Sequence, residues 1–163
     1  MQFRASIAAA ASLFALANAR IYGIAFPETV KAGDQVNAII ETENYIQSVQ
    51  DVAIAFGIAP EASAYPGTLS TVIGSFYLGP GKLPRGPRGR HKFVLNMFQI
   101  EKSNVLDNIT ETVTIPAELA AGTYVVSAGV YSLYGASSST TLTNYNVTIT
   151  VGDATSENYV GSQ

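Results

Sequence analysis

Residues 123–151 read TYVVSAGVYSLYGASSSTTLTNYNVTITV, and they carry the clearest secondary-structure signal in the chain. Its first part, Thr123–Leu133, is rich in valine and tyrosine, which favour β-strands. Its last part, Thr141–Val151, places Tyr, Val, Ile and Val on one side and Asn, Asn, Thr and Thr on the other. Gly135–Ser139 between them is small and polar. Two such segments joined by a short turn predict a β-hairpin.

Five segments upstream have a similar β-rich character: Arg20–Phe26, Gln35–Asn44, Asp51–Ala59, Thr68–Leu78 and Thr110–Ile115. The first ends at Pro27, which predicts an edge strand. The third has Val, Ile and Phe on one face and only Ala and Gly on the other, which suits a central strand packed closely against another segment. Seven strands with turns between them predict an all-β fold, an immunoglobulin-like β-sandwich.

The composition restricts the classes of function. The chain has 163 residues, of which 47% are hydrophobic and 13% are charged, so it is expected to fold as one globular domain. Nine basic residues stand against twelve acidic ones, for a net charge of -3, which leaves no basic excess for nucleic-acid binding. Cysteine is absent, which excludes disulfides, thiolate metal sites and a cysteine nucleophile.

The N-terminus has the layout of a secretory signal peptide. Met1–Arg4 carries one positive charge, Ile7–Ala17 is apolar and uncharged, and Ala17-Asn18-Ala19 supplies small residues. The apolar run is shorter than the ~20 residues that a membrane span needs. We expect cleavage between Ala19 and Arg20, which leaves residues 20–163 as a single exported domain without a membrane span. A buried N-terminal helix is the alternative interpretation.

Two sequons agree with export. Asn108-Ile109-Thr110 and Asn146-Val147-Thr148 both match the N-glycosylation pattern. The strand alternation predicts that Asn146 faces outward, where a glycan has room. Asn108 and Asn146 are therefore candidate glycosylation sites.

Gly81–Lys102 departs from the rest of the chain. It reads GKLPRGPRGRHKFVLNMFQIEK. The chain after Ala19 has 8 basic and 12 acidic residues, and this segment holds 6 and 1 of them, which leaves 2 basic and 11 acidic residues, net -9. The remainder of the domain is therefore strongly acidic.

Three interpretations of this segment compete. It is an exposed basic loop that binds anions or membranes, a solvated insertion, or a translated intron. The abrupt change in composition favours the insertion and the intron over the functional loop. Sequencing the spliced transcript would distinguish them.

Catalytic arrangements are scarce. The one histidine, His91, lies in the atypical segment, so a Ser-His-Asp arrangement has a single candidate base and a histidine metal site is excluded. Glu41 and Glu43 share one face of a predicted strand and form a candidate carboxylate pair, but alternation also explains them as a solvated face. Asp34 and Asp51 are predicted at turns. We expect a protein that is not an enzyme and that has no cofactor.

Tyrosines are the most informative candidates for recognition. Tyr45, Tyr131 and Tyr134 form a candidate partner surface, because exposed tyrosines suit protein recognition. Tyr124 opens the penultimate strand, where it either makes the hydrogen bond of a β-sandwich tyrosine corner or fills the core.

Several strings resemble one family closely. They are RIYGIA at 20–25, GDQ at 33–35, IETENYIQSVQDVAIAFG at 40–57 and YSLYGASS at 131–138. They are similar to the necrosis-inducing secreted protein family of fungal effectors. The resemblance covers nearly all of the chain after Ala19 except Gly81–Lys102. The family passes almost directly from Gly79-Pro80 to Ser103-Asn104-Val105, which supports the insertion or intron interpretation.

The resemblance implies a secreted effector of plant-associated fungi that suppresses pattern-triggered immunity. Members bind and inhibit host receptor-associated kinases, among them a leucine-rich-repeat co-receptor kinase and a receptor-like cytoplasmic kinase, and some provoke cell death. The effector would leave the fungus through its signal peptide and then reach the host cytoplasm. Because the remaining charge is negative, we expect an acidic, tyrosine-bearing face to be steered toward a basic patch on the kinase.

Proteins of two other classes fit the same sequence. An extracellular carbohydrate- or cell-wall-binding module is the first alternative, since β-sandwiches often serve in that way. Such a module needs a row of exposed aromatic side chains, and the chain has no tryptophan. A hydrolase that uses Glu41 and Glu43 is the second.

Overall fold

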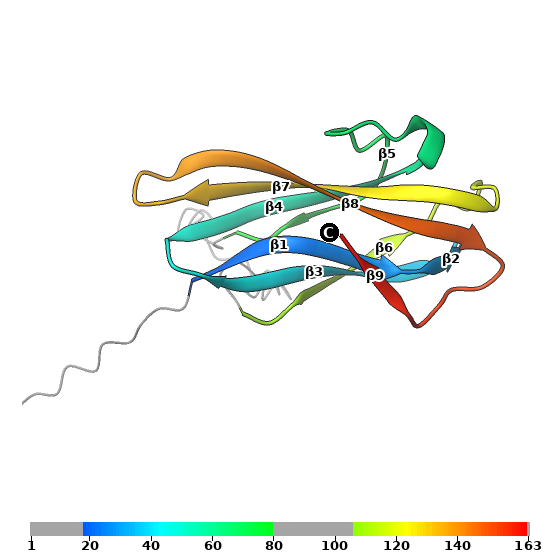
Figure 1. The fold of residues 1–163 in the computed structure, drawn as a ribbon, viewed down its shortest axis with the longest axis horizontal. Coiled ribbons are helices and arrows are strands. Elements are labelled where there is room, and N and C mark those ends of the chain that lie inside the picture. The colour runs from blue at the N-terminus through cyan, green and yellow to red at the C-terminus, as the bar shows by residue number, and fades with distance from the viewer. Residues whose placement is uncertain (1–17, 80–105, 163) are drawn as a thin grey trace, which may run out of the picture.

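The computed structural model describes residues 18–79 and 106–162, which form two β-sheets stacked face to face (Figure 1). The first sheet has the strand order β6-β3-β1-β9 and the second has the order β2-β8-β7-β4-β5. The strands are β1 (Asn18–Pro27), β2 (Thr29–Lys31), β3 (Gln35–Tyr45), β4 (Val49–Pro60), β5 (Thr71–Tyr77), β6 (Ile109–Thr114), β7 (Gly122–Tyr134), β8 (Ser139–Gly152) and β9 (Tyr159–Gly161). The predicted all-β sandwich is confirmed.

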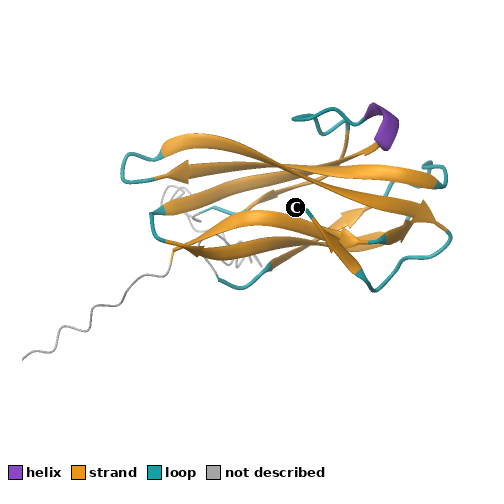
Figure 2. Cartoon of the chain, in the orientation of Figure 1, coloured by secondary structure: helices purple, strands orange, loops and turns teal. Residues whose placement is uncertain are grey.

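All seven predicted strands are present, and the described residues contain two more. The additional strands, β2 and β9, have three residues each; β2 runs parallel to β8 and β9 runs antiparallel to β1. The described residues contain one short 3₁₀ turn, Glu61–Ser63, which follows β4 (Figure 2). The predicted signal peptide and Gly81–Lys102 with His91 lie outside the described residues, apart from Asn18 and Ala19, which belong to β1.

The predicted β7–β8 hairpin is present. Pairing runs from Gly122 opposite Val151 to Tyr134 opposite Ser139. The turn closes with a hydrogen bond from the Ser138 N–H to the Gly135 carbonyl, 3.1 Å between N and O. Both of these turn residues have positive φ, which glycine adopts without strain.

The interior between the sheets is apolar. Phe26 of β1 and Phe56 of β4 meet edge to face, with 5.6 Å between ring centroids, so the two layers interlock at the centre. Tyr124 is 7% exposed and belongs to this core, as the core-filling interpretation predicted.

The β4 strand is central, as its small residues predicted. It pairs with β7 on one side and with β5 on the other. The loop before β5 crosses the outer side of β4, and a Cβ at Gly57 would overlap the backbone carbonyl of Leu69. The absence of a side chain at Gly57 therefore permits this close crossing.

The prediction of an edge position for β1 is wrong. β1 lies between β3 and β9, although β9 covers only Ala25, Phe26 and Pro27. Directly after β9, Ser162 accepts from the Ile24 N–H through its hydroxyl and donates its own backbone N–H to the Ile24 carbonyl. The sequence pattern missed this because β9 is too short to show alternation.

Candidate functional site

One end of the sandwich gathers polar and aromatic side chains. There the β3–β4 turn meets the β7–β8 turn, and the Gly135 N–H donates to the Ser48 carbonyl at 2.8 Å. Because strands from both sheets end here, residues that are distant in sequence become neighbours. We refer to this group as the tyrosine end; it consists of Arg20, Tyr45, Asp51, Ser132, Tyr134 and Tyr145.

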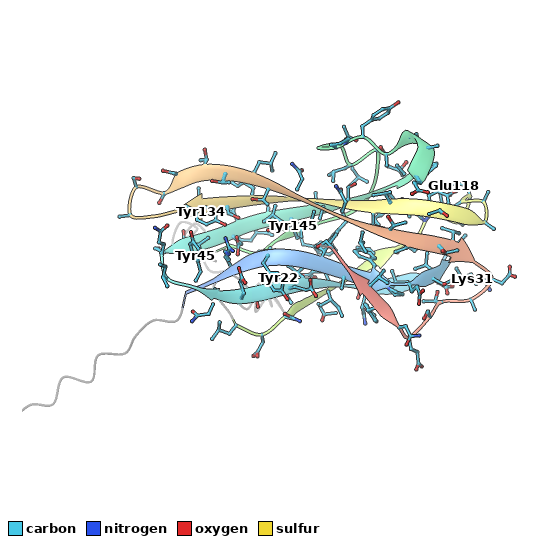
Figure 3. The ribbon with its side chains drawn as sticks, viewed as in Figure 1. Tyr22, Lys31, Tyr45, Glu118, Tyr134 and Tyr145 are labelled. Carbon is cyan, nitrogen blue, oxygen red and sulfur yellow. The ribbon has the colours of Figure 1, made fainter. Side chains whose placement is uncertain are left out.

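Two predicted recognition residues meet at the tyrosine end. Tyr45 is the last residue of β3 and Tyr134 is the last residue of β7 (Figure 3). Their rings stand at 89° with centroids 5.9 Å apart, an edge-to-face contact. The Arg20 guanidinium lies over the Tyr45 ring, 4.8 Å from its centroid, and its Nε donates to Glu43 at 2.7 Å. The result is a partly exposed surface made of two aromatic rings and one cation.

Beneath these rings lies a buried carboxylate that the sequence analysis placed incorrectly. Asp51 is predicted at a turn but is inside β4 and 3% exposed. Its Oδ1 accepts from the Ser132 hydroxyl at 2.6 Å and its Oδ2 accepts from the Ile21 N–H at 3.3 Å. Burial raises the pKa of Asp51, and these two hydrogen bonds oppose that shift.

A β-bulge explains the orientation of Asp51. Asp51 is opposite Ser132 and Ala53 is opposite Tyr131, so Val52 is an extra residue in β4. The extra residue reverses the alternation, and Asp51 therefore faces inward although Ala53 faces outward. Asp34 does lie at a turn, as predicted, and its carboxylate accepts from the Thr155 hydroxyl at 2.8 Å.

Tyr145 completes the connection between the sheets. Its hydroxyl donates to the Ile21 carbonyl at 2.8 Å, and burial raises the pKa of Tyr145 to about 12. The backbone N–H and C=O of Ile21 are thus both bonded to side chains of the five-stranded sheet, Asp51 and Tyr145. Burial also raises the pKa of Tyr134, with the nearby Asp51 carboxylate as the second cause. The hydrogen bonds of Asp51 and Tyr145 to Ile21 therefore connect β1 to the opposite sheet.

The third predicted recognition residue lies elsewhere. Tyr131 is 40% exposed on the outer face of β7, whereas Tyr134 contacts Tyr45 at the end of the sandwich. The candidate surface of three tyrosines is therefore divided: the structure brings Tyr45 and Tyr134 together and separates Tyr131 from them.

The outer face around Tyr131 is uncharged. The strands β8, β7, β4 and β5 contain one charged residue, Asp51, and it points inward. We refer to the outer side of these four strands as the neutral face. A groove of about 500 Å³ crosses it, with Tyr131 and Tyr77 among its lining residues. Sequence reasoning missed Tyr77, because only the register of β5 on β4 shows that it shares a row with Tyr131.

Glu43 is paired with Arg20, and the Glu41 carboxylate lies over Gly23 on the same side of β3. Both sequon asparagines are exposed. The Asn108 side-chain oxygen accepts from the Thr42 N–H at 3.2 Å, and Asn146 lies on the outward side of β8 as predicted.

Residues 18–79 and 106–162 contain no group of three or more His, Cys, Asp or Glu side chains placed to hold a metal ion. Within the same ranges, no helix has the length and apolar character needed to cross a membrane.

Comparison with known proteins agrees with the resemblance. The family model described as the Nis1 family matches residues 17–150. The chain belongs to the Nis1 family. Necrosis-inducing secreted protein 1 of Colletotrichum higginsianum (strain IMI 349063) is 71% identical over 163 residues, covering 100% of this chain and 99% of the relative.

Two further matches extend the comparison. Necrosis-inducing secreted protein 1 of Colletotrichum orbiculare (strain 104-T) is 61% identical over 163 residues, covering 100% of this chain and 88% of the relative. Among solved structures, superoxide reductase (neelaredoxin) from Ignicoccus hospitalis matches with a TM-score of 0.44 and 14% identity, covering 83% of this chain and 80% of that chain.

Proposed function

We propose that this chain is a secreted fungal effector that suppresses plant pattern-triggered immunity by binding and inhibiting receptor-associated host kinases. It also induces cell death in some plants, and it reaches the host cytoplasm after export through its signal peptide. The observation that carries the proposal is membership of the Nis1 family, with two relatives whose names state secretion and necrosis induction. The same names support an extracellular location.

The tyrosine end is the surface that we assign to the kinase contact. Tyrosine and arginine are the residue types most often found at energetic hot spots of protein interfaces, and Tyr45 contacts both Arg20 and Tyr134 here. Glu41 and Glu43 add negative charge beside them. Since the described residues include 2 basic and 11 acidic ones, their field favours approach to a basic patch.

Direct binding to the kinase domains of plant receptor-associated kinases tests the proposal. Tyr45→Ala and Tyr134→Ala should each weaken binding about tenfold, as the loss of a moderate hot-spot residue does. Tyr131→Ala is the control, because it removes an exposed tyrosine from the neutral face. Equal losses in all three variants would refute the assignment to the tyrosine end, and no binding by the unmutated protein would refute the kinase proposal.

Two additional measurements separate the parts of this proposal. The association rate should fall as salt is raised, because screening shortens the range of electrostatic steering; an unchanged rate would refute the electrostatic part. Kinase activity assays with residues 20–163, made with and without 81–102, test whether the atypical segment takes part. We expect inhibition by both forms.

A further inference from the structure

The neutral face carries a row of exposed side chains that runs across four strands. In the pairing register, Leu142 of β8 is opposite Tyr131 of β7, Tyr131 is opposite Ala53 of β4, and Ala53 is opposite Tyr77 of β5. Leu142, Tyr131 and Tyr77 are 67%, 40% and 48% exposed. The two tyrosines therefore stand on either side of Ala53, roughly 10 Å apart between Cα atoms, which is two strand spacings.

Small residues make the floor between these tyrosines. In the next row, Ala55 is opposite Gly129 on one side and Ser75 on the other. The groove of about 500 Å³ that crosses the face is lined by these residues and by the two tyrosines, and its volume lies in the range of small-ligand sites. The groove exists because Ala53, Ala55 and Gly129 carry almost no side chain.

The polar groups at this groove are neutral. Ser75 lines it, and Asn144 of β8 is opposite Gly129, where its Oδ1 would lie 3.8 Å from a Cβ added to Gly129. Hydroxyl and amide groups donate and accept hydrogen bonds without charge. A charged ligand would find no counter-ion on the outer side of these four strands, and it would lose hydration without compensation.

We infer that this groove binds a neutral glycan chain, with sugar rings stacked on Tyr131 and Tyr77. A pyranose ring presents apolar C–H faces and a rim of uncharged hydroxyls. The groove offers aromatic faces and an uncharged hydroxyl, and the uncharged amide of Asn144 lies beside its floor at Gly129. An apolar protein segment is disfavoured, since Ser75 and Asn144 would then lie against groups that make no hydrogen bonds. The site is separate from the tyrosine end, so it adds a binding activity to the proposed kinase contact.

Titration calorimetry of the secreted full chain with soluble hexasaccharides tests the inference. The probes are β-1,4-linked glucan, β-1,3-linked glucan and chitin hexamers, with a galacturonate hexamer as the anionic comparison. We expect at least one neutral probe to bind with Kd below about 1 mM and the anionic probe to bind at least tenfold more weakly. Absence of binding by every neutral probe, or preference for the anionic one, overturns the inference.

Matched variants locate the site. Tyr131→Ala and Tyr77→Ala should each weaken binding about tenfold, whereas Tyr45→Ala should leave it unchanged. Gly129→Thr fills the groove floor while keeping both tyrosines, and a Cβ there meets only ordinary contacts, 3.8 Å or more away. Because threonine favours strands, this variant should fold normally and lose binding. Full binding by a folded Gly129→Thr protein would refute the groove as the site.

Two controls complete the design. Asn146 lies on the same face, so the Asn146→Gln protein is measured alongside, and it should bind at least as well as the unmodified protein. Sedimentation at the titration concentrations distinguishes glycan binding from self-association through the neutral face. A dimer that the Gly129→Thr substitution dissociates would overturn the inference in favour of a second copy of the chain. If the unmutated protein binds glycan but does not bind the kinase domains, only the proposed function is refuted.

Discussion

The outer faces of the two sheets differ in charge although both belong to one small domain. The four-stranded sheet carries Arg20 on β1 and Glu41 and Glu43 on β3 on its outer face, and Glu111 of β6 lies on its inner side. The strands of the neutral face carry no outward charge. Edge strands are commonly protected by charge, including inward-pointing charge, and Glu111 has that position on β6. The charged sheet is therefore protected from strand addition, and the neutral sheet is suited to uncharged ligands.

Adding a methyl group to one glycine in each sheet tests this difference between the sheets. A Cβ at Gly57, on the outer side of β4, would overlap the Leu69 backbone carbonyl, whereas a Cβ at Gly23 would meet chiefly the flexible end of the Glu41 side chain. We expect Gly57→Ala to lower the free energy of unfolding by about 3 kcal/mol, the upper part of the range for overpacking. Gly23→Ala should cost about 1 kcal/mol or less, because the carboxylate can rotate away. Urea unfolding of both variants measures the difference, and equal losses would contradict it.

The second prediction concerns the one charge in the strands of the neutral face. Asp51→Ala leaves the Ser132 hydroxyl and the Ile21 N–H without this acceptor, and we expect a loss of about 2 kcal/mol. Asp51→Asn is the control, because it keeps the shape and removes the charge. Urea unfolding at neutral pH measures both variants. A larger loss of unfolding free energy in Asp51→Asn than in Asp51→Ala would contradict the interpretation that Asp51 stabilises the fold through these two hydrogen bonds.

The pH dependence of the same site follows from the direction of its pKa shift. Burial raises the pKa of Asp51, so the folded protein holds this proton to higher pH than the unfolded chain. The stability contributed by this group is fully present below the unfolded value, about 3.9, and is lost as the pH rises through the folded pKa. The unfolding free energy of the unmutated protein relative to Asp51→Asn should therefore fall from about pH 4 toward neutral. A rise over this range would contradict the burial argument.

The third prediction tests how the neutral sheet supports the charged one. Tyr145→Phe removes the hydroxyl that donates to the Ile21 carbonyl and leaves the ring in place. One neutral hydrogen bond contributes about 1 kcal/mol, which is the expected loss in unfolding free energy. Hydrogen exchange should show faster opening of β1 near Ile21 than in the unmutated protein. Unchanged hydrogen exchange near Ile21 would indicate that the Tyr145 hydroxyl does not stabilise β1.

Local patterns predicted the strands well, because alternation on one strand depends on that strand alone. The outward position of Asn146 and the inward position of Val147 follow from such a pattern and are confirmed. Asp51 was predicted at a turn, but β4 begins two residues earlier, at Val49, and one extra residue, Val52, reverses the alternation so that Asp51 faces inward. That bulge is a property of the pairing of β4 with β7, and the sequence of β4 does not contain it.

The candidate sites also depend on strand pairing, which the sequence of one strand does not contain. The sequence identified Tyr45, Tyr131 and Tyr134 as recognition residues but not how they divide between two surfaces. Tyr77 shares a row with Tyr131 only through the registers of β5 and β7 on β4. The absence of tryptophan counted against a row of exposed aromatic side chains, yet tyrosines from two separate strands form one. Registers between distant strands are set by the packed core, so they cannot be read from any single segment.

The smallest expected effect lies on the charged face. Arg20 and Glu43 form a salt bridge whose side chains are 40% and 41% exposed, and exposed pairs contribute about 0 to 1 kcal/mol. Glu43→Gln keeps an acceptor for the Arg20 Nε and removes the charge, so the loss in unfolding free energy should be below about 1 kcal/mol. The loss should be smaller still near 1 M salt, where the Debye screening length is about 3 Å. Asn144→Asp, the reverse change on the neutral face, should be equally small in stability but should weaken binding of a neutral glycan. A large, salt-independent loss for Glu43→Gln would show that the charged face stabilises the fold, and the contrast between the two faces would then reflect stability as well as recognition.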